Sequence, residues 1–356
     1  MSEFSFYSGK RVFVTGHTGF KGSWLTQWLV KCGAVVTGFA LSPENENSFF
    51  DSLGLSQKIN SVIGDIRDFN ALDAAFTAAK PEVVFHLAAQ PIVLESYKNP
   101  RYTYETNVMG TVNLLECVRK ADTVQSLLNV TTDKVYKNSD DDKPFSEEDK
   151  LDGFDPYSNS KSCSELVTHS YFSSFLKDIG VAVSTARAGN VIGGGDDADN
   201  RIIPDCVRAA KKHETIVIRN PYSVRPYQHV LEPLSAYLDI AARQCSEHSL
   251  CGAYNIGPRL SDCITTGELA DLFCSSWGDG ASWESGCLSG PHEAAMLKLD
   301  CSKIEKALGR APVTDISDAV RLTVDYYKRT MMGESAEKTV LEQIEEFEIK
   351  SRAARY

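Results

Sequence analysis

Short β-branched segments alternate with stretches of helical periodicity through the first half of the chain. The apolar runs predict six strands: Val12–Val14, Val35–Phe39, Val62–Ile63, Val83–His86, Ser126–Thr131 and Val181–Ala186. The amphipathic stretches between them predict four helices: Ser23–Lys31, Phe69–Ala79, Thr106–Val118 and Tyr157–Leu176. Such alternation is typical of an α/β fold, a doubly wound parallel sheet with helices on both faces. Ligands of these sheets bind outside the carboxyl ends of the strands.

From about Gly189 onward this alternation stops. Gly193–Asp197 has the composition of a flexible loop, and prolines such as Pro204 and Pro221 interrupt the segments that follow. We expect a smaller substrate-binding lobe here, interleaved with segments that return to the sheet, and a terminal helix around Leu341–Ile349. The predicted organisation is a dinucleotide-binding domain over residues 1–188 with a returning segment at about 228–258, and a second lobe over residues 189–227 and 259–356.

Three glycines at three-residue intervals, Gly16, Gly19 and Gly22, stand between the first predicted strand and the first predicted helix. Flexible turns produce such spacing by chance, but this placement favours a dinucleotide-binding turn. The backbone can turn tightly there and approach a pyrophosphate, which the N-terminus of the following helix attracts. The prediction is a Rossmann-type cofactor site that also includes Thr18 and Phe20.

The end of the second strand indicates which nicotinamide cofactor is bound. A carboxylate there binds the adenosine ribose, whereas a basic residue suits a 2′-phosphate. This strand end offers neither, the nearest acid is Glu44, and no Lys or Arg occurs between Lys31 and Lys58. The pattern therefore favours NAD. Asp65, after the third strand, is expected to accept a hydrogen bond from the adenine amino group, since Asp68 fits a helix N-cap better.

Tyr157 and Lys161 lie four residues apart, so a helix would place the phenol and the ammonium on one face. An unperturbed tyrosine has a pKa of about 10 and is a poor base at neutral pH. A neighbouring ammonium and the positive nicotinamide ring would lower that pKa toward the working range. Among fourteen tyrosines one such pair is expected by chance, but downstream of the glycine turn it indicates a proton-transfer site.

Thr132, Asp133 and Lys134 follow the fifth predicted strand, where an α/β sheet delivers catalytic side chains. We expect Thr132 to hydrogen-bond a substrate hydroxyl beside Tyr157. Asp133 and Lys134 place an acid and a base at the edge of a hydride-transfer site. An isolated Asp-Lys pair is more often a salt-bridged strand end, but the neighbouring motifs favour the catalytic interpretation.

Arg219 and Arg225 flank prolines in the predicted second lobe. Arginine grips phosphate oxygens bidentately. A solvated surface arginine is the ordinary explanation, but a proline-stiffened loop favours a phosphate site. His292 is a candidate for the same pocket, although a lone histidine is more often structural.

Composition limits the partners of the chain. Its 356 residues carry a net charge of −11, which argues against nucleic acid and anionic membrane surfaces as partners. No segment has the roughly 20 apolar residues of a membrane-spanning helix, and the N-terminus lacks a signal-peptide pattern. The ten cysteines are scattered, so we expect free thiols, no zinc site and a cytoplasmic protein.

Together these motifs resemble the extended short-chain dehydrogenase/reductase family. The segments His86–Gln90 and Asn107–Thr111 add to the match, and Thr132-Asp133 ahead of Val135-Tyr136 is similar to the sugar-nucleotide 4,6-dehydratases. In the dTDP-glucose branch a Glu follows that aspartate, where this chain has Lys134. Three longer stretches are similar to the branch that acts on CDP-glucose: Gly16–Leu25, Gly189–Asp196 and Arg225–Pro233.

The resemblance implies a dehydration with internal hydride transfer through bound NAD. Tyr157 would take the proton of the sugar's 4-hydroxyl, and protonated Asp133 would give a proton to the departing 6-hydroxyl. Lys134 would take the carbon-5 proton or, if charged, stabilise the enolate, while Lys161 would lower the pKa of Tyr157 and hold the nicotinamide ribose. Further cofactor contacts are expected from Asp65, Ile66, Ala88, Ala89, Gln90 and Asn107. Substrate contacts are expected from Asn190, Arg201, Arg219, Arg225 and His292.

Two other functions stay open at this point. A nucleotide-sugar 4-epimerase would share the glycine turn, Tyr157 and Lys161 but would not need an acid at Asp133. A non-catalytic NAD-binding regulator would keep the glycines and have no reason to hold the other groups together. The resemblance also implies a homodimer or homotetramer built through two helices, Thr106–Arg119 and Tyr157–Leu176. The sequence leaves open whether their apolar residues serve that contact or the core: Leu114, Leu115, Val118, Leu166 and Phe172.

Overall fold

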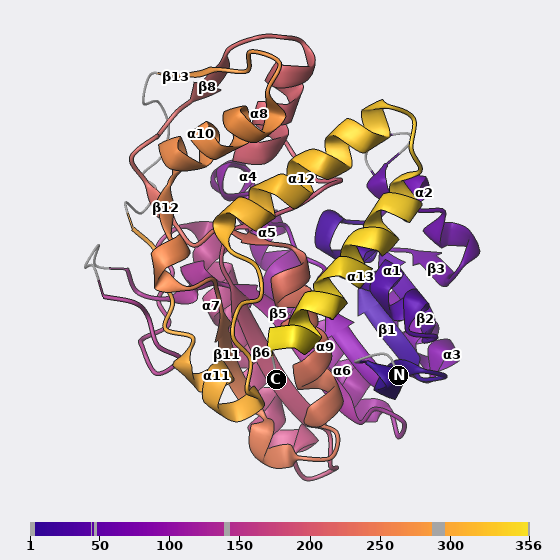
Figure 1. The fold of residues 1–356 in the computed structure, drawn as a ribbon. Helices are drawn as coiled ribbons and strands as arrows, with labels where there is room; N and C mark the ends of the chain where they lie inside the picture. Colours follow the sequence, from indigo (N-terminus) through magenta and orange to yellow (C-terminus); the bar gives the residue numbers. More distant parts are fainter. Residues whose placement is uncertain (1–3, 44, 46–47, 139–142, 287–295, 355–356) are drawn as a thin grey trace.

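A seven-stranded parallel sheet forms the centre of the molecule (Figure 1). The computed structural model describes residues 4–43, 45, 48–138, 143–286 and 296–354. Across the sheet the strands follow the order β3-β2-β1-β4-β5-β6-β11. Their bounds are β1 Arg11–Thr15, β2 Val35–Ala40, β3 Asn60–Ile63, β4 Val83–His86, β5 Ser126–Thr132, β6 Ala182–Ala188 and β11 Gly252–Ile256.

Helices cover both faces of this sheet, as the alternating pattern predicts. On one face α1 (Phe20–Lys31) and α9 (Leu231–Arg243) share a core with residues such as Val12, Phe85 and Val130. On the other face, a second core forms around strand residues such as Phe13 and Val84. It includes side chains from α3 (Phe69–Ala79), from α6 (Gly110–Lys120), and from α7 (Pro156–Tyr171) with its extension. Remaining short helices before β5 are α2 Phe49–Ser52, α4 Val93–Lys98 and α5 Pro100–Tyr104.

The predicted elements of the first half are confirmed, with differences at their ends. The first helix begins at Phe20 because Gly19 is its N-cap. The third and fourth predicted helices each contain a π-helical turn, at Glu105–Met109 before α6 and at Phe172–Leu176 after α7. Strand β11 was not predicted as a strand, because Gly252–Ile256 has no clear alternation; it pairs with β6.

The second half of the chain forms a smaller region of short strands and helices. Between parts of this region, α9 and β11 return to the central sheet. The short strands come as three pairs: β7 Val191–Ile192 with β10 Gln228–His229, β9 Val224–Arg225 with β12 Ile264–Thr265, and β8 Ile216–Ile218 with β13 Trp283–Ser285. The accompanying helices are α8 Ile202–Lys211, α10 Thr266–Trp277, α11 Ser302–Leu308, α12 Ile316–Met331 and α13 Ala336–Ala354. Figure 1 shows α12 and α13 as an antiparallel hairpin, in which α13 passes beside α1.

The terminal helix α13 is fastened to the helix that follows the glycine turn. Trp28 on α1 donates its Nε1 hydrogen to Glu348 Oε1 (2.9 Å), and Lys31 Nζ lies 2.9 Å from Glu348 Oε2. The Trp28 ring also meets Phe347 edge-on. The terminal helix predicted around Leu341–Ile349 thus extends over Ala336–Ala354, and its contacts hold it against α1.

The triple glycine after β7 is tightly packed, which corrects the expectation of a flexible loop. A Cβ on Gly194 would lie 2.0 Å from the ring of Tyr326, and one on Gly195 would lie 2.2 Å from the ring of Phe49. Trp24 donates its indole hydrogen to the Gly194 carbonyl (2.9 Å). Glycine is required here by close packing against the rings of Tyr326 and Phe49 rather than by mobility.

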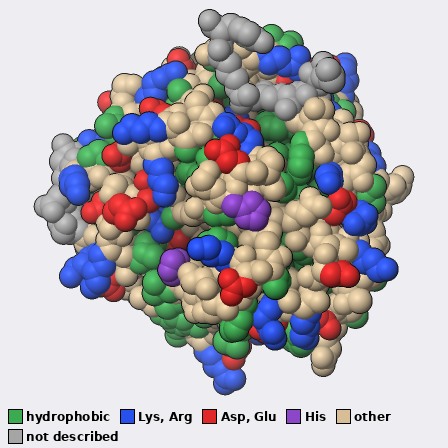
Figure 2. All heavy atoms as spheres, turned by 90° about the horizontal axis from the view of Figure 1, so that it is seen from below, with side chains coloured by type: hydrophobic (Ala, Val, Ile, Leu, Met, Phe, Trp, Pro, Cys, Tyr) green, Lys and Arg blue, Asp and Glu red, His purple; other side chains and the backbone are tan. Residues whose placement is uncertain are grey.

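The apolar residues considered for subunit contact differ in their exposure to solvent. Leu114, Leu115 and Val118 lie in the core of this chain, whereas Leu166 is 55% exposed. Figure 2 shows basic and acidic side chains interspersed over the face viewed from below.

Within the described ranges no helix is long and apolar enough to cross a membrane, no cluster of potential metal ligands occurs, and the nine cysteines are free.

Candidate active site

The glycine turn joins β1 to α1 at the carboxyl edge of the sheet. Gly16 has a φ of +76°, and a Cβ there would lie 2.8 Å from the Ala88 nitrogen. A Cβ on Gly22 would lie 1.9 Å from the Gly16 carbonyl oxygen. By contrast, a Cβ on Gly19 would make only a 3.5 Å contact within the chain. Gly16 and Gly22 are thus needed for folding, whereas Gly19 leaves room over the helix N-terminus.

Different outcomes are expected when these glycines are replaced. Gly22→Ala should lower the melting temperature measurably, because its methyl group would overlap backbone atoms. Gly19→Ala should fold normally and bind dinucleotide at least about tenfold more weakly, because its methyl group occupies the approach to the helix amides. Calorimetry and a cofactor titration test both. Equal effects of the two variants on folding would contradict the assignment of Gly22 to folding and of Gly19 to cofactor binding.

The N-terminus of α1 opens onto a cleft of about 420 Å³. Gly19 is its N-cap without a side-chain hydrogen bond, and the first turn contains no acidic residue. Unpaired N–H groups and the positive end of the helix dipole therefore face the cleft, an arrangement that suits a pyrophosphate. The predicted residues that line the cleft are Gly16, Thr18, Gly19, Phe20, Gly22, Asp65, Ile66, Ala88, Ala89, Tyr157, Lys161 and Arg201.

Two predicted cofactor residues lie behind the lining of the cleft. Asn107, in the π-helical turn, accepts a hydrogen bond from the Gln90 backbone nitrogen (2.8 Å). Its amide donates to the Gln90 carbonyl (3.1 Å) and to Ser160 Oγ (2.9 Å). Gln90 and Asn107 thus tie the loop after β4 to helix α7, and they shape the wall of the cleft from behind.

Asp65, which follows β3, lines the cleft. Its carboxylate accepts hydrogen bonds from the Arg67 backbone and guanidinium (2.9 and 2.6 Å), and the Arg67 side chain lowers the pKa of Asp65. Asp68 is the N-cap of α3, as predicted. Glu44 lies outside the described residues, so the carboxylate nearest to the β2 end in the sequence is not placed.

Tyr157 and Lys161 project from the first turns of α7 toward the floor of the cleft. The helix begins at Pro156, and Asp155 caps it by accepting a hydrogen bond from Ser158 (2.9 Å). Lys161 Nζ donates to the Val130 carbonyl of β5 (3.1 Å). Both side chains are thereby held at the end of the strand that carries the next group of candidates.

Burial shifts the pKa of both side chains of this pair. Burial raises the pKa of Tyr157 to about 12, although a hydrogen bond with Thr132 and the charge of Arg201 act in the opposite direction. Burial, and then the charge of Lys21, lower the pKa of Lys161 to about 8. Burial therefore opposes the predicted lowering of the phenol's pKa, a prediction that included the positive charge of the nicotinamide ring.

Thr132, Asp133 and Lys134 lie where β5 ends in a 3₁₀ turn. Asp133 is fully buried, and its Oδ1 accepts a hydrogen bond from Thr132 Oγ1 (3.0 Å). Lys134 Nζ lies 3.6 Å from the same oxygen. Within the described part of the chain, the other oxygen, Oδ2, has no hydrogen-bond partner. A buried carboxyl oxygen without a partner is costly, so this one suits a ligand hydroxyl.

The predicted substrate residues fall into two groups. A Cβ on Gly189 would lie 3.3 Å from Asp133 Oδ2 and 2.6 Å from the ring of Pro226, which brings Asn190 and Arg225 to the catalytic end of β5. The buried Oδ1 atom of Asn190 has no hydrogen-bond partner in the described structure. Buried Arg225 donates to the Val224 carbonyl (2.9 Å).

Arg201 lines the cleft, whereas Arg219 is not among its lining residues. Arg201 donates to both carboxylate oxygens of Asp196 (3.0 Å each). Arg219 is exposed and donates to the Asn200 carbonyl (3.3 Å). His292 lies outside the described residues.

Lys21 is a site residue that the sequence analysis missed. It lines the cleft between two glycines of the turn, where burial and the charge of Arg201 lower its pKa to about 8. Asp133 and Asp196 act in the opposite direction. The sequence feature that could have indicated Lys21 is a charged residue between the glycines of the turn, in the first turn of the helix whose N-terminus faces the cleft.

Sheet order, glycine turn and the Tyr157-Lys161 pair together define an extended short-chain dehydrogenase/reductase. The sequence model described as GDP-mannose 4,6 dehydratase matches residues 13–256. A CDP-glucose 4,6-dehydratase of Salmonella typhimurium is 46% identical over 340 residues, which cover 94% of this chain and 95% of that protein. The chain belongs to this family of sugar-nucleotide 4,6-dehydratases.

Solved structures agree with the fold. The dTDP-glucose 4,6-dehydratase of Streptomyces venezuelae, solved with NAD bound, is 26% identical and superposes with a TM-score of 0.77 over 90% of this chain and 98% of its own. The UDP-glucose 4-epimerase of Thermotoga maritima, 22% identical, also gives a TM-score of 0.77, over 90% of this chain and 99% of its own. Because dehydratases and epimerases share the fold, the side chains must distinguish between the two activities.

Proposed function

We propose that the protein is an NAD-dependent lyase that converts CDP-glucose to CDP-4-keto-6-deoxyglucose and water. The observation that carries this proposal is the buried Asp133 carboxyl group beside Tyr157, with one oxygen left for a ligand. A 4-epimerase has no need for an acid there, and a regulator needs neither group. The 46% identity to a CDP-glucose 4,6-dehydratase along almost the whole chain supports the substrate assignment.

The residues of the cleft fit NAD. Gly19 and the uncapped start of α1 provide the pyrophosphate site, and Asp65 lies on the adenosine side. NAD held there would supply the hydride acceptor and donor for transfer of hydride from carbon 4 to carbon 6 of the sugar. The positive charge of its nicotinamide ring would favour the phenolate of Tyr157 and so oppose the effect of burial on that pKa.

The chain's own groups then move the protons. Tyr157, with Thr132 hydrogen-bonded to it and Lys161 beneath, takes the proton of the 4-hydroxyl. The 4-ketone acidifies the hydrogen at carbon 5, which permits elimination. Asp133 gives a proton to the 6-hydroxyl as carbon 5 loses its proton and the carbon–oxygen bond breaks, and water leaves. Carbon 5 takes a proton back as carbon 6 receives hydride, and the 4-hydroxyl proton held by Tyr157 restores Asp133 for the next turnover. Asn190, Arg201, Arg219 and Arg225 bind the nucleotide diphosphate, with His292 as a further candidate.

Asp133 and Lys134 can supply both the acid and the base of the elimination. The ammonium nitrogen and the nearer carboxylate oxygen lie 3.6 Å apart, an ion-pair distance, and we assign the one transferable proton of this pair to Asp133 at the start of the elimination. When the proton lies on Asp133, the carboxyl group is the acid and the neutral amine of Lys134 is the base for carbon 5. This arrangement explains why Lys can follow the aspartate where the dTDP-glucose enzymes have Glu.

Lys134→Met should abolish exchange of the carbon-5 hydrogen with solvent while formation of the 4-ketone continues. The neutral methionine retains much of the length of the side chain but cannot take a proton. Exchange is measured by mass spectrometry in heavy water. The exposed Lys150→Met variant, whose lysine pairs with Asp152, is the control. Normal exchange in Lys134→Met would exclude Lys134 as the base.

A homodimer or homotetramer formed through α6 and α7 is part of the proposal. Leu166 and Phe175 are exposed on this side of the molecule, and Arg119 stacks over the Phe175 ring at 5.6 Å. Exposed apolar side chains on α7 and on the π-helical turn that continues it suit a subunit contact. Sedimentation equilibrium of the purified chain measures the assembly state.

The direct test of the activity is mass spectrometry of the nucleotide sugar after incubation with CDP-glucose and NAD, without a reductant. Loss of one water with no net NADH is the expected result. An unchanged mass with an altered sugar would indicate a 4-epimerase. No change with CDP-glucose or with other nucleotide sugars would exclude both enzymatic assignments.

A further inference from the structure

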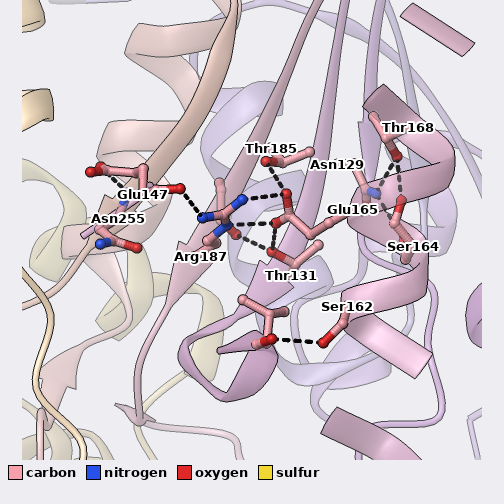
Figure 3. A network of polar contacts seen from close by, with 12 residues as sticks. Asn129, Thr131, Glu147, Ser162, Ser164, Glu165, Thr168, Thr185, Arg187 and Asn255 are labelled. Atoms are coloured by element: carbon pink, nitrogen blue, oxygen red, sulfur yellow. Dashed lines mark hydrogen bonds and ion pairs between the residues drawn. The ribbon is translucent and has the colours of Figure 1, made fainter. Parts of the chain in front are cut away.

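A buried polar network lies behind the catalytic residues, between β5, β6 and α7 (Figure 3). Its centre is Glu165 on α7, one helical turn beyond Lys161. Glu165 Oε1 accepts hydrogen bonds from Thr131 Oγ1 (2.5 Å) and Arg187 Nε (3.1 Å). Its Oε2 accepts from Thr185 Oγ1 (2.6 Å) and Arg187 Nη2 (3.0 Å). Four donors face this carboxylate, an arrangement matched to its ionised form.

The same helix is fastened to β5 on both sides of Glu165. Asn129 donates to Ser164 Oγ (3.0 Å) and Thr168 Oγ1 (2.8 Å), as Figure 3 shows. Ser162 Oγ donates to the Val135 carbonyl (2.7 Å). Together with the bonds from Lys161 and Glu165, these contacts fix how α7 lies along the strand that ends in Thr132 and Asp133.

Charge completes the geometry around Lys161. The charge of Lys21 on α1 lowers the pKa of Lys161. The carboxylate of Glu165, which lies on α7 with Lys161, raises that pKa and so favours the ammonium. His86 on β4 is neutral, because burial lowers its pKa to about 3. Tyr157, also on α7, is an uncharged phenol because burial raises its pKa, and Arg187 on β6 is paired with Glu165. Without Glu165, burial and Lys21 would act on Lys161 unopposed.

We propose that Glu165 is a positioning residue of the reaction. Its carboxylate, clamped by Arg187, holds α7 on β5 and keeps the Lys161 ammonium charged beneath Tyr157. This inference rests on the proposed function only through the role of Lys161. No motif in the sequence had indicated it, because Glu165 and Arg187 meet only when β6 packs beside β5.

Glu165→Gln is the test variant, because it removes the charge while keeping the size and the acceptor for Thr131. The holoenzyme's kcat for CDP-glucose is measured against pH. The alkaline limb, where activity falls as Lys161 loses its proton, should move toward lower pH by about one unit in the variant. KM should change by less than about twofold, since Glu165 does not line the cleft.

Thr185→Val is the matched control. It removes one hydrogen bond from the same carboxylate and keeps the charge, so it should lower the melting temperature without moving the alkaline limb. If Glu165→Gln does not fold, the double variant Glu165→Gln/Arg187→Met removes both charges and should show a displacement in the same direction. An unmoved alkaline limb in the folded variant would overturn the proposal, because a merely structural role lowers kcat equally at every pH.

A second readout separates this proposal from the proposed function. In the protein without cofactor, the titration of Lys161 is followed by NMR with isotope-labelled lysine and assigned by its loss in Lys161→Met. Glu165→Gln should lower the titration midpoint. That result would support the inference even if CDP-glucose is not converted, and an unchanged midpoint would overturn it even if CDP-glucose is converted.

Discussion

Tyr157→Phe should reduce kcat by at least about 100-fold, the contribution expected of a positioned proton-transfer group. The variant removes one oxygen from a buried ring and leaves its packing intact. Nucleotide-sugar binding should stay within about twofold of the wild type, because the residues proposed for the diphosphate lie on other elements. Initial rates with CDP-glucose and a binding titration with CDP-glucose measure the two effects separately.

The matched control is Tyr104→Phe. Tyr104 donates its phenolic hydrogen to Asn159 (2.9 Å), so this variant removes another hydroxyl group in contact with the same helix. Its turnover should remain close to that of the wild type. If Tyr157→Phe keeps most of its turnover, the phenolate mechanism is wrong and another group must take the 4-hydroxyl proton.

Asp133→Asn should stop the reaction between its two halves. The amide keeps the hydrogen bond from Thr132 but cannot give a proton to the departing 6-hydroxyl. Oxidation at carbon 4 continues, so the variant should accumulate bound NADH while water loss slows by roughly 100-fold or more. Rapid mixing with CDP-glucose, monitored through the absorbance of reduced nicotinamide, measures the accumulation.

Asp152→Asn is the control for this variant. Its side chain is 45% exposed and pairs with Lys150, so the replacement should leave both half-reactions unchanged. Elimination at the normal rate in Asp133→Asn would remove Asp133 from the role of acid. A variant that forms neither NADH nor product would show that Asp133 acts before elimination.

The features predicted from the sequence are those that neighbouring residues encode. The glycine turn needs only the spacing of Gly16 and Gly22, and the pair of Tyr157 and Lys161 needs only helical periodicity. The strands beside them are short apolar runs whose period is visible in the sequence. Their positions at one edge of the sheet follow from the parallel topology.

Other features depend on contacts between distant segments. The triple glycine was taken for a flexible loop because the rings of Phe49 and Tyr326 that press on it lie far away in the sequence. The lowered pKa of Lys21 and the raised pKa of Tyr157 both follow from burial, which a sequence motif does not reveal. The Glu165–Arg187 pair joins α7 to β6, and no local pattern connects those residues.

Transfer of deuterium from carbon 4 to carbon 6 within one molecule tests the central claim most directly. CDP-glucose labelled with deuterium at carbon 4 is incubated with the protein and NAD, and the product is analysed by mass spectrometry and NMR. The account predicts loss of one water with the deuterium retained at carbon 6 and no net NADH. Water loss with the deuterium released to solvent, or retention of the label at carbon 4, would contradict it.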